Sequence, residues 1–373
     1  MVREFLYNRL MRVSLALALF ALPAFAQTAG VHWIAPTDSP LEVDGLPWFA
    51  EGGAGQWFRL PMRLADTLPK AVWNLGHSPS GGRIRFRTDS NLFAIRLEYP
   101  SAPDMTNMHA FGQTGVDLYL DGIYRGTAVA KKDSTADAPV EQVYLDLKGQ
   151  PRVEREATIY LSLYKPVKVL ALGLDADAKV SKPRAFAVAK PVVFYGTSIT
   201  QGGCASRPGM AYQAILGRML NIDFVNLGFS GAGKGEPEVA RMVAEIDASA
   251  FVFDFAQNNG TVASLSEVYE PFLNTVREKH PQTPIVAITP IANSRETLPG
   301  REGELPRMRA LIRNVASKHI AAGDEHLQIV EGTDLLGPER ADGLVDGTHP
   351  NDLGFQWMAE GLAPRLRRVL GVN

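Results

Sequence analysis

Residues 192–203 read VVFYGTSITQGG, an apolar run followed by a turn of small residues. Similar apolar runs stand at 224–229, 251–256, 285–290 and 327–332, and segments with helical periodicity separate them. Continuous apolar strands that alternate with helices predict a parallel sheet covered by helices on both faces. Because ligands bind such sheets beyond the carboxyl ends of the strands, we expect the functional residues at that edge.

The preceding part of the chain follows a different period. GRIRFRT and LFAIRLEY alternate apolar with polar residues around Asp89-Ser90-Asn91, which predicts a β-hairpin. GVDLYLDGIYRGTAV alternates in the same way around the turn dipeptide Asp121-Gly122. With the alternating segments VEQVYLDL and ATIYLSLYKPVKVLALGL, these strands predict an all-β sandwich or jelly-roll domain. We place this domain at 27–182 and an α/β domain at 183–373.

The first 26 residues are typical of a secretory signal peptide. Three arginines precede the apolar run 13–22, and Ala24-Phe25-Ala26 forms a small-x-small cleavage pattern. The sequence therefore predicts cleavage near Ala26 and a secreted or periplasmic mature protein. A transmembrane helix needs about 20 apolar residues, and this run is shorter, so we expect no stable membrane insertion.

Composition narrows the classes of partner. The formal net charge is −2, with 38 basic and 40 acidic residues, so nothing favours nucleic-acid binding. Cys204 is the only cysteine, which excludes an intramolecular disulfide. Apart from His349, the histidines at 32, 77, 109, 280, 319 and 326 show no metal-ligand spacing. We predict neither a metal nor another cofactor.

Two segments carry the residue types of nucleophilic catalysis. Ser198 stands at a strand-to-helix turn, where it is either a nucleophile or the N-cap of the next helix. Asp346-Gly347-Thr348-His349 follows the last strand. A serine hydroxyl becomes nucleophilic when an imidazole takes its proton and a carboxylate orients that imidazole. The alternative is that Asp346 begins a turn or helix and His349 has no catalytic role.

Two further strand ends offer hydrogen-bond donors. NLGFSG covers 226–231 and DFAQNNG covers 254–260. Donors aimed at a carbonyl oxygen stabilise the charge that develops there during ester cleavage. Taken separately, both segments are equally compatible with ordinary turns.

The order of these four blocks, with serine, glycine, asparagine and DxxH each at a strand end, closely resembles the SGNH/GDSL hydrolase superfamily. GTSITQGGCASRPGMAY and NLGFSGAGKGEPEVA are similar to the subgroup with an additional N-terminal β domain. The Gly-x-Asp-Leu-Tyr hallmark of that domain stands at Gly115-Val116-Asp117-Leu118-Tyr119. The resemblance implies a three-layer, flavodoxin-like α/β domain with a parallel sheet, preceded by the β domain.

Carried over residue by residue, the resemblance implies a catalytic triad of Ser198, His349 and Asp346. The backbone N–H groups of Ser198 and Gly231 and the side chain of Asn258 would form the oxyanion hole. The first block departs from the commoner Gly-Asp-Ser by having Gly-Thr-Ser. Ala256-Gln257 precedes the third block, which makes Asn258 and Asn259 harder to distinguish, and we favour Asn258.

The resemblance also implies hydrolysis of short acyl esters, often acetyl, with a small-molecule or glycan ester as the substrate. Two alternatives remain open, an acyltransferase with the same chemistry and a non-catalytic glycan-binding protein. The complete set of four blocks argues against the latter. Other conspicuous residues have simpler interpretations: Asp254 as a structural hydrogen-bonding group, Lys234 as a solvated loop residue, and Cys204 as a small buried side chain.

Overall fold

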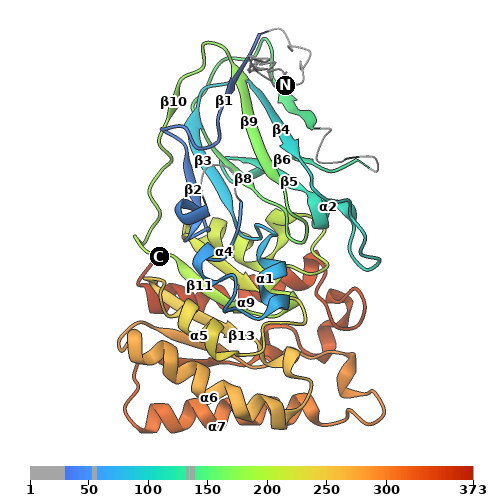
Figure 1. The fold of residues 1–373 in the computed structure, drawn as a ribbon, viewed down its shortest axis with the longest axis vertical. Helices are drawn as coiled ribbons and strands as arrows, with labels where there is room; N and C mark the ends of the chain where they lie inside the picture. Colours follow the sequence, from blue (N-terminus) through green and yellow to red (C-terminus); the bar gives the residue numbers. More distant parts are fainter. Residues whose placement is uncertain (1–29, 53–56, 132–133, 135–138, 373) are drawn as a thin grey trace, which may run out of the picture.

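The computed structural model of the chain describes residues 30–52, 57–131, 134 and 139–372. The predicted signal peptide at 1–26 lies outside these residues. An antiparallel β region and a mixed helix-and-strand region stack along the long axis of the molecule (Figure 1). Among the described helices, none combines the length and the apolar character needed to cross a bilayer.

Two antiparallel sheets form the N-terminal region. The first has the order β1-β9-β4-β7, with bounds Val31–Ile34, Lys168–Asp175, Leu92–Glu98 and Val140–Asp146. The second has the order β10-β3-β8-β5-β6, with bounds Val180–Ser181, Arg83–Thr88, Arg155–Tyr160, Val116–Leu120 and Ile123–Ala128, and β2 (Glu42–Asp44) pairs with β3. The two short helices of this region are α1 (Lys70–Gly76) and α2 (Ala110–Thr114).

The sandwich core lies between these sheets. Ile84 and Phe86 of β3 share one apolar cluster with Ile95 and Leu97 of β4. The predicted hairpin 81–98 is therefore wrong, because β3 and β4 belong to different sheets and Asp89–Asn91 connects them across the sandwich. The alternation indicated correctly which side chains face inward, but an inward face is compatible with either arrangement.

The second predicted hairpin is confirmed. β5 and β6 pair antiparallel, and Asp121 and Gly122 connect them with φ values of 49° and 76°. Two consecutive positive φ angles are characteristic of the tight turn that matches strand twist, and Asp-Gly accepts them at low cost.

The C-terminal region contains a five-stranded parallel sheet in the order β12-β11-β13-β14-β15. Its strands span Phe224–Gly228, Val192–Gly196, Ala250–Asp254, Ile285–Ile288 and Leu327–Val330, in that order. All five coincide with the predicted apolar runs. The order is the flavodoxin-like 2-1-3-4-5, which places the ligand-binding crevice where β11 and β13 end.

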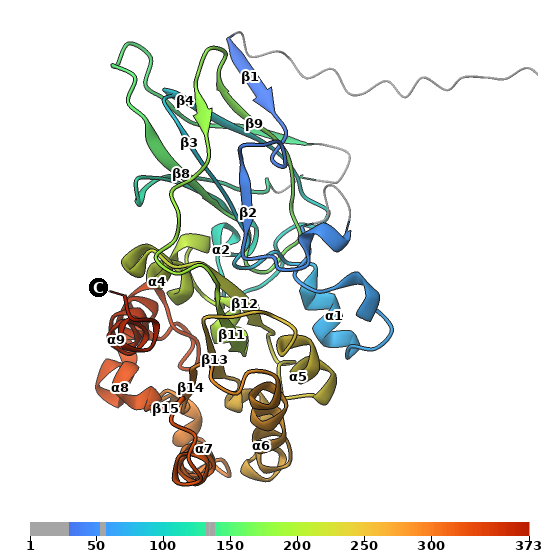
Figure 2. The same cartoon turned by 90° about the vertical axis from the view of Figure 1, so that its left-hand side faces the viewer.

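Helices cover both faces of this sheet (Figure 2). One face carries α4 (Tyr212–Leu220), α8 (Gly332–Leu335) and α9 (Asp352–Leu370), and the other carries α5 (Pro237–Val243), α6 (Val262–Lys279) and α7 (Glu304–Ala321). The one-turn α3 (Ser198–Gln201) directly follows β11. In β11, Val192 and Phe194 pack on the first side and Val193 and Tyr195 on the second. This arrangement confirms the predicted three-layer fold.

Part of the N-terminal segment packs into the α/β core. Trp48, Phe58, Leu60 and Val72 join the apolar cluster that lies under α5–α7. Between them, the buried Arg59 donates hydrogen bonds to four backbone carbonyls, which belong to Leu75, Ser78, Asn226 and Gly228. Two of these carbonyls lie in β12, so the segment is attached to the parallel sheet itself.

The Gly-x-Asp-Leu-Tyr motif also connects the two regions. The buried Asp117 accepts hydrogen bonds from Arg207 (3.1 Å) and from the N–H of Gly209 (2.8 Å), which follow α3. Tyr119 bonds the same arginine and packs on Gly209, where a Cβ atom would lie 2.4 Å from the Tyr119 hydroxyl. The motif therefore fixes the loop that follows the candidate nucleophile.

Candidate active site

Ser198 is the first residue of α3, at the carboxyl end of the interior strand β11, which lies between β12 and β13. Thr197, and not Ser198, is the N-cap of this helix, since its hydroxyl accepts the N–H of Ile199. Threonine is among the residues preferred at an N-cap, because its hydroxyl accepts a backbone N–H of the first turn. Capping by Thr197 leaves the Ser198 hydroxyl available for another partner.

That partner is His349. The Ser198 Oγ lies 2.9 Å from His349 Nε2, and His349 Nδ1 lies 2.8 Å from Asp346 Oδ2. Asp346 and His349 belong to the loop between β15 and α9, 148 or more positions after Ser198 in sequence. The structure thus brings together the three residues predicted as a triad, in the order hydroxyl, imidazole, carboxylate.

The Asp346 carboxylate is surrounded by donors. Its Oδ1 accepts the N–H groups of Thr348 (3.0 Å) and His349 (2.9 Å), and its Oδ2 also accepts Asn107 Nδ2 at 3.0 Å. Partial burial raises the pKa of Asp346, but the bonds from Asn107 and His349 outweigh it and hold the pKa well below its usual range. The carboxylate is consequently ionised at neutral pH.

The two backbone N–H groups predicted for the oxyanion hole have no acceptor in the part of the protein that the structure describes. Within the described residues, neither the N–H of Ser198 nor that of Gly231 donates to another protein group. Gly231 has a φ of +66°, a conformation that side chains rarely adopt. The turn is held next to α3 because the Ser230 N–H donates to Gln201 Oε1 at 2.9 Å.

Asn258 lies beside this turn, but its amide is occupied. Its Nδ2 donates to the carbonyls of Phe229 (2.9 Å) and Gly233 (3.1 Å) on either side of Gly231. Asn258 and Gly231 line one cavity, which Asn259 does not line. Asn258 braces the turn in this arrangement, and its role as a third oxyanion donor stays a prediction that requires one of these bonds to open.

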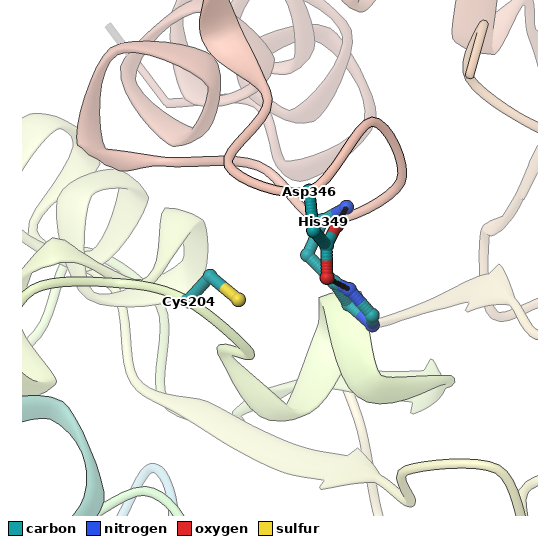
Figure 3. A group of neighbouring side chains, drawn as sticks. All are labelled: Cys204, Asp346 and His349. Atoms are coloured by element: carbon teal, nitrogen blue, oxygen red, sulfur yellow. Dashed lines mark hydrogen bonds and ion pairs between the residues drawn. The ribbon is translucent and has the colours of Figure 1, made fainter. Parts of the chain in front are cut away.

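Cys204 lies next to Asp346 and His349, as Figure 3 shows. One ligand atom from each of these three residues falls within 4.8 Å of the others. The thiol donates to the carbonyl of Asn107 at 3.1 Å, and burial, followed by the charge of Asp346, raises its pKa to about 12. A protonated thiol is a poor metal ligand. Both His349 nitrogens already have partners, Ser198 and Asp346. The geometry therefore favours the predicted triad over a metal site.

Asp254 and Lys234, which were also singled out in the sequence, have environments that agree with the structural interpretations given to them. Asp254 is buried at the end of β13 and accepts a long bond from Thr200 Oγ1 (3.4 Å). Burial raises the pKa of Asp254 to about 7. Lys234 is exposed, and its backbone N–H donates to Glu236.

Three contacts at the site were not predicted from the sequence. Asn107 reaches Asp346 from the β region, and Tyr164, in the β8–β9 loop, donates from its hydroxyl to the Ser198 carbonyl at 3.3 Å. Gln201 holds the Ser230 N–H and also donates to the carbonyl of Leu163. Only Gln201 lies in a quoted motif, and the positions of the other two depend on how the β region packs on the sheet.

Comparison with known protein families assigns both regions. Residues 189–367 match the GDSL-like lipase/acylhydrolase family, and residues 31–180 match the N-terminal domain of SGNH-hydrolase-type esterases, the GxDLY domain. A solved structure named as a GDSL-like lipase, from Bacteroides ovatus ATCC 8483, is 31% identical over 92% of this chain and 99% of its own, with a TM-score of 0.80. The chain belongs to the GDSL-like lipase/acylhydrolase family.

Other solved structures share the fold at lower identity. The salicylyl-acyltransferase SsfX3 of a tetracycline biosynthetic pathway is 24% identical, covers 92% of this chain and 99% of its own, and has a TM-score of 0.75. A family two carbohydrate esterase from Clostridium thermocellum, in complex with cellohexaose, is 17% identical over 78% of this chain and 93% of its own, with a TM-score of 0.59. No curated protein sequence matches the chain. The predicted SGNH/GDSL-type esterase class is confirmed at the level of the family.

Proposed function

We propose that this GDSL-family esterase is an exported enzyme that removes short acyl groups, acetyl foremost, from carbohydrates. The observation that carries the proposal is the continuous hydrogen-bonded series from Ser198 through His349 to Asp346. It stands at the carboxyl end of β11, beside β13, where this fold binds ligands.

In the first half-reaction, the Ser198 Oγ attacks the ester carbonyl while His349 Nε2 takes the hydroxyl proton. The carbonyl oxygen becomes an anion that the N–H groups of Ser198 and Gly231 stabilise. The C–O bond then breaks, His349 returns the proton to the leaving alcohol, and an acyl-serine remains. Water repeats the sequence and releases the carboxylic acid, while Asp346 keeps the imidazole in the reactive tautomer.

Fold neighbours support the carbohydrate substrate. One is the carbohydrate esterase bound to cellohexaose, and another is an acetyl xylan esterase from Butyrivibrio proteoclasticus, 16% identical with a TM-score of 0.58. At these identities the likeness concerns the fold, so the substrate is an inference by analogy. Export rests on the signal-peptide pattern of residues 1–26.

An acyltransferase is the second candidate, and the fold shared with the salicylyl-acyltransferase favours it. The acyl-serine would be the same, and an acceptor alcohol would replace water. Partitioning of the acyl group between water and added alcohols distinguishes the two functions. A non-catalytic glycan-binding protein would hydrolyse no ester at all.

The test is hydrolysis of 4-nitrophenyl acetate, butyrate and octanoate and of acetylated xylan by the mature protein. We expect acetate to be cleaved fastest, and Ser198→Ala and His349→Ala each to lower kcat by at least about a thousandfold. Ser266→Ala is the matched control, since this α6 hydroxyl bonds only the Ala263 carbonyl.

An inactive wild type, or a Ser198→Ala variant that keeps its rate, would refute the catalytic assignment.

Export is tested separately, by the N-terminus of the protein. The N-terminal sequence of protein recovered outside the cytoplasm is expected to begin at Gln27, and recovery of the uncleaved chain in the cytoplasm would contradict it.

A further inference from the structure

A cavity of about 390 Å³ opens directly beside the candidate oxyanion hole. Gly231 and Asn258 form one side of it, and Gln257, Arg295 and Arg301 line the rest together with Gly260 and Leu298. A substrate whose carbonyl oxygen reached the Gly231 N–H would therefore extend part of its structure into, or next to, this cavity.

The two arginines give the cavity an unbalanced positive charge. Within the described part of the chain, neither Arg295 nor Arg301 forms an ion pair, and no acidic residue lines the cavity. Arg295 is held in place by one bond, from its Nη1 to the Gln257 carbonyl at 3.1 Å, which leaves its other N–H groups available.

The nearest acid is already engaged elsewhere. Glu304 lines the adjoining smaller cavity, accepts the N–H of Val262 and pairs with Arg307. The charge of Arg301 contributes to a lowered pKa of Glu304, after larger contributions from these two bonds. Glu304 therefore offsets part of the positive charge from the adjoining cavity, and it does not line the larger one.

Gln257, a residue of the cavity wall, has a side-chain nitrogen without a partner among the described residues. Gln257 is 5% exposed, its Oε1 accepts Asn293 Nδ2 at 2.7 Å, and its Nε2 is buried without any hydrogen bond. A buried N–H group without an acceptor costs free energy, and such groups in folded proteins call for a specific explanation. Because this nitrogen is itself buried, the donors that a ligand in the cavity would meet are those of the two arginines.

We propose that this cavity binds a carboxylate carried by the ester substrate, so that the enzyme prefers anionic esters over neutral ones of the same size. Two guanidinium groups suit a carboxylate, whose oxygens accept paired N–H bonds. The proposal rests on the proposed esterase function. The carboxylate belongs either to the alcohol, as in a uronic acid, or to the acyl group, as in a dicarboxylic half-ester.

Two matched pairs of probes separate these sources. Mono-O-acetylated methyl glucuronoside and methyl glucoside differ in a carboxylate on the alcohol side, and acetate release is measured. Mono(4-nitrophenyl) adipate and its methyl-capped diester differ in a carboxylate on the acyl side, and nitrophenol release is measured. We expect kcat/KM to favour the anionic member of one pair by about tenfold, and the preference to weaken as salt is added.

The Arg295→Gln/Arg301→Gln variant is expected to bring that ratio close to one, and Arg301→Gln alone, at an exposed position, to lower it partly. Arg313→Gln removes an exposed cation of the same type from α7, where it pairs with Glu331, and is expected to keep the wild-type ratio. A ratio near one for both pairs in the wild type, with Ser198-dependent cleavage of the neutral esters, would overturn the carboxylate site and leave the esterase function intact.

If no ester is cleaved, the esterase function itself fails, and the site is judged by binding. Calorimetric titration with methyl glucuronoside and with monomethyl adipate should then give a Kd at least about tenfold weaker in the double variant than in the wild type. Equal binding by the two proteins, or none by either, would overturn the site as well.

Discussion

Asn107 belongs to the β region and bonds Asp346, so its substitution tests whether this region influences the proposed triad. Its Nδ2 lies 3.0 Å from Asp346 Oδ2, and that oxygen lies 2.8 Å from His349 Nδ1. A carboxylate introduced by Asn107→Asp would therefore stand within about 6 Å of the imidazole. At that separation, the attraction between the new carboxylate and the protonated ring is about 0.7 kcal/mol for a dielectric constant of about 80, the value of bulk water. It is about 3 kcal/mol for an effective constant of about 20, which is typical near a protein surface.

The added charge favours the protonated imidazole, which is unable to act as a base. We expect the acidic limb of the kcat/KM profile to move to higher pH by about half a unit to two units. Asn107→Ala removes the neutral donor without adding charge. Since both side chains are partly exposed, we expect it to lower kcat/KM by only about three- to tenfold.

The assay is the pH dependence of 4-nitrophenyl acetate hydrolysis between pH 4 and 9, with acetate release used where the ester hydrolyses spontaneously. Thr106→Asp is the control, because it places the same charge one residue away, without a hydrogen bond to Asp346 in the wild-type structure. Profiles of Asn107→Asp and Thr106→Asp that superimpose on that of the wild type would refute the coupling between Asn107 and the proposed triad.

Three further variants test other parts of the structure. Asp346→Asn should lower kcat/KM by about a thousand- to ten-thousandfold, because an amide NH₂ would face a donor in either orientation and favour the wrong imidazole tautomer; steady-state kinetics measures this. Burial raises the pKa of Asp254 to about 7, above an unfolded value of about 3.9, so wild-type stability should fall as pH rises from about 4 to 7. Asp254→Asn should flatten that fall, and its melting temperature should exceed that of the wild type by more at pH 8 than at pH 5. Gly209→Ala places a Cβ atom 2.4 Å from the Tyr119 hydroxyl, and we expect a loss of about 2 kcal/mol in urea unfolding.

The parallel sheet was predictable because its strands are buried on both faces. The segments 192–196 and 224–228 contain almost only apolar residues, and glycine or a small polar residue ends each of them. Such a pattern specifies the strand and its end without reference to any distant residue. Since parallel strands present their carboxyl ends at one edge, the order of strands and helices along the chain is enough to predict that the four sequence blocks converge.

The pairing of the β sandwich was not predictable in the same way. Residues 83–88 and 92–98 both place apolar side chains at every second position, yet β3 pairs with β2, β8 and β10, and β4 pairs with β7 and β9. Alternation reports which side chains face the core, whereas the partner depends on whether the chain turns back within a sheet or crosses to the other one. The turn residues Asp89-Ser90-Asn91 are compatible both with a hairpin within one sheet and with a connection between the two sheets.

The N-cap of α3 is a second feature that the sequence alone left undecided. Thr197 and Ser198 are adjacent and both suit an N-cap, so the sequence left the function of Ser198 open. The structure separates them, because Thr197 accepts the Ile199 N–H and the Ser198 hydroxyl turns to His349. A one-residue difference in where the helix begins decides which hydroxyl is available for chemistry.

Three residues from the N-terminal half of the chain bear on the site at different points. Asn107 bonds Asp346, Tyr164 bonds the Ser198 carbonyl, and Arg59 bonds the carbonyls of Asn226 (3.0 Å) and Gly228 (2.8 Å). Arg59 is 1% exposed, and burial lowers its pKa to about 9.

A buried cation that bonds carbonyls and lies over an aromatic ring (Phe229, 4.8 Å), without a carboxylate partner in the described part of the chain, is costly, so its presence calls for a compensating gain. The carbonyls that Arg59 holds end the strand leading to the Gly231 turn, and the same segment supplies Trp48 and Phe58 to the core under α5–α7. Separating the α/β region from residues 46–78 would expose that core and release the strand end together. The β region is therefore part of the structure that fixes the catalytic geometry, and not an appendage to a self-sufficient hydrolase domain.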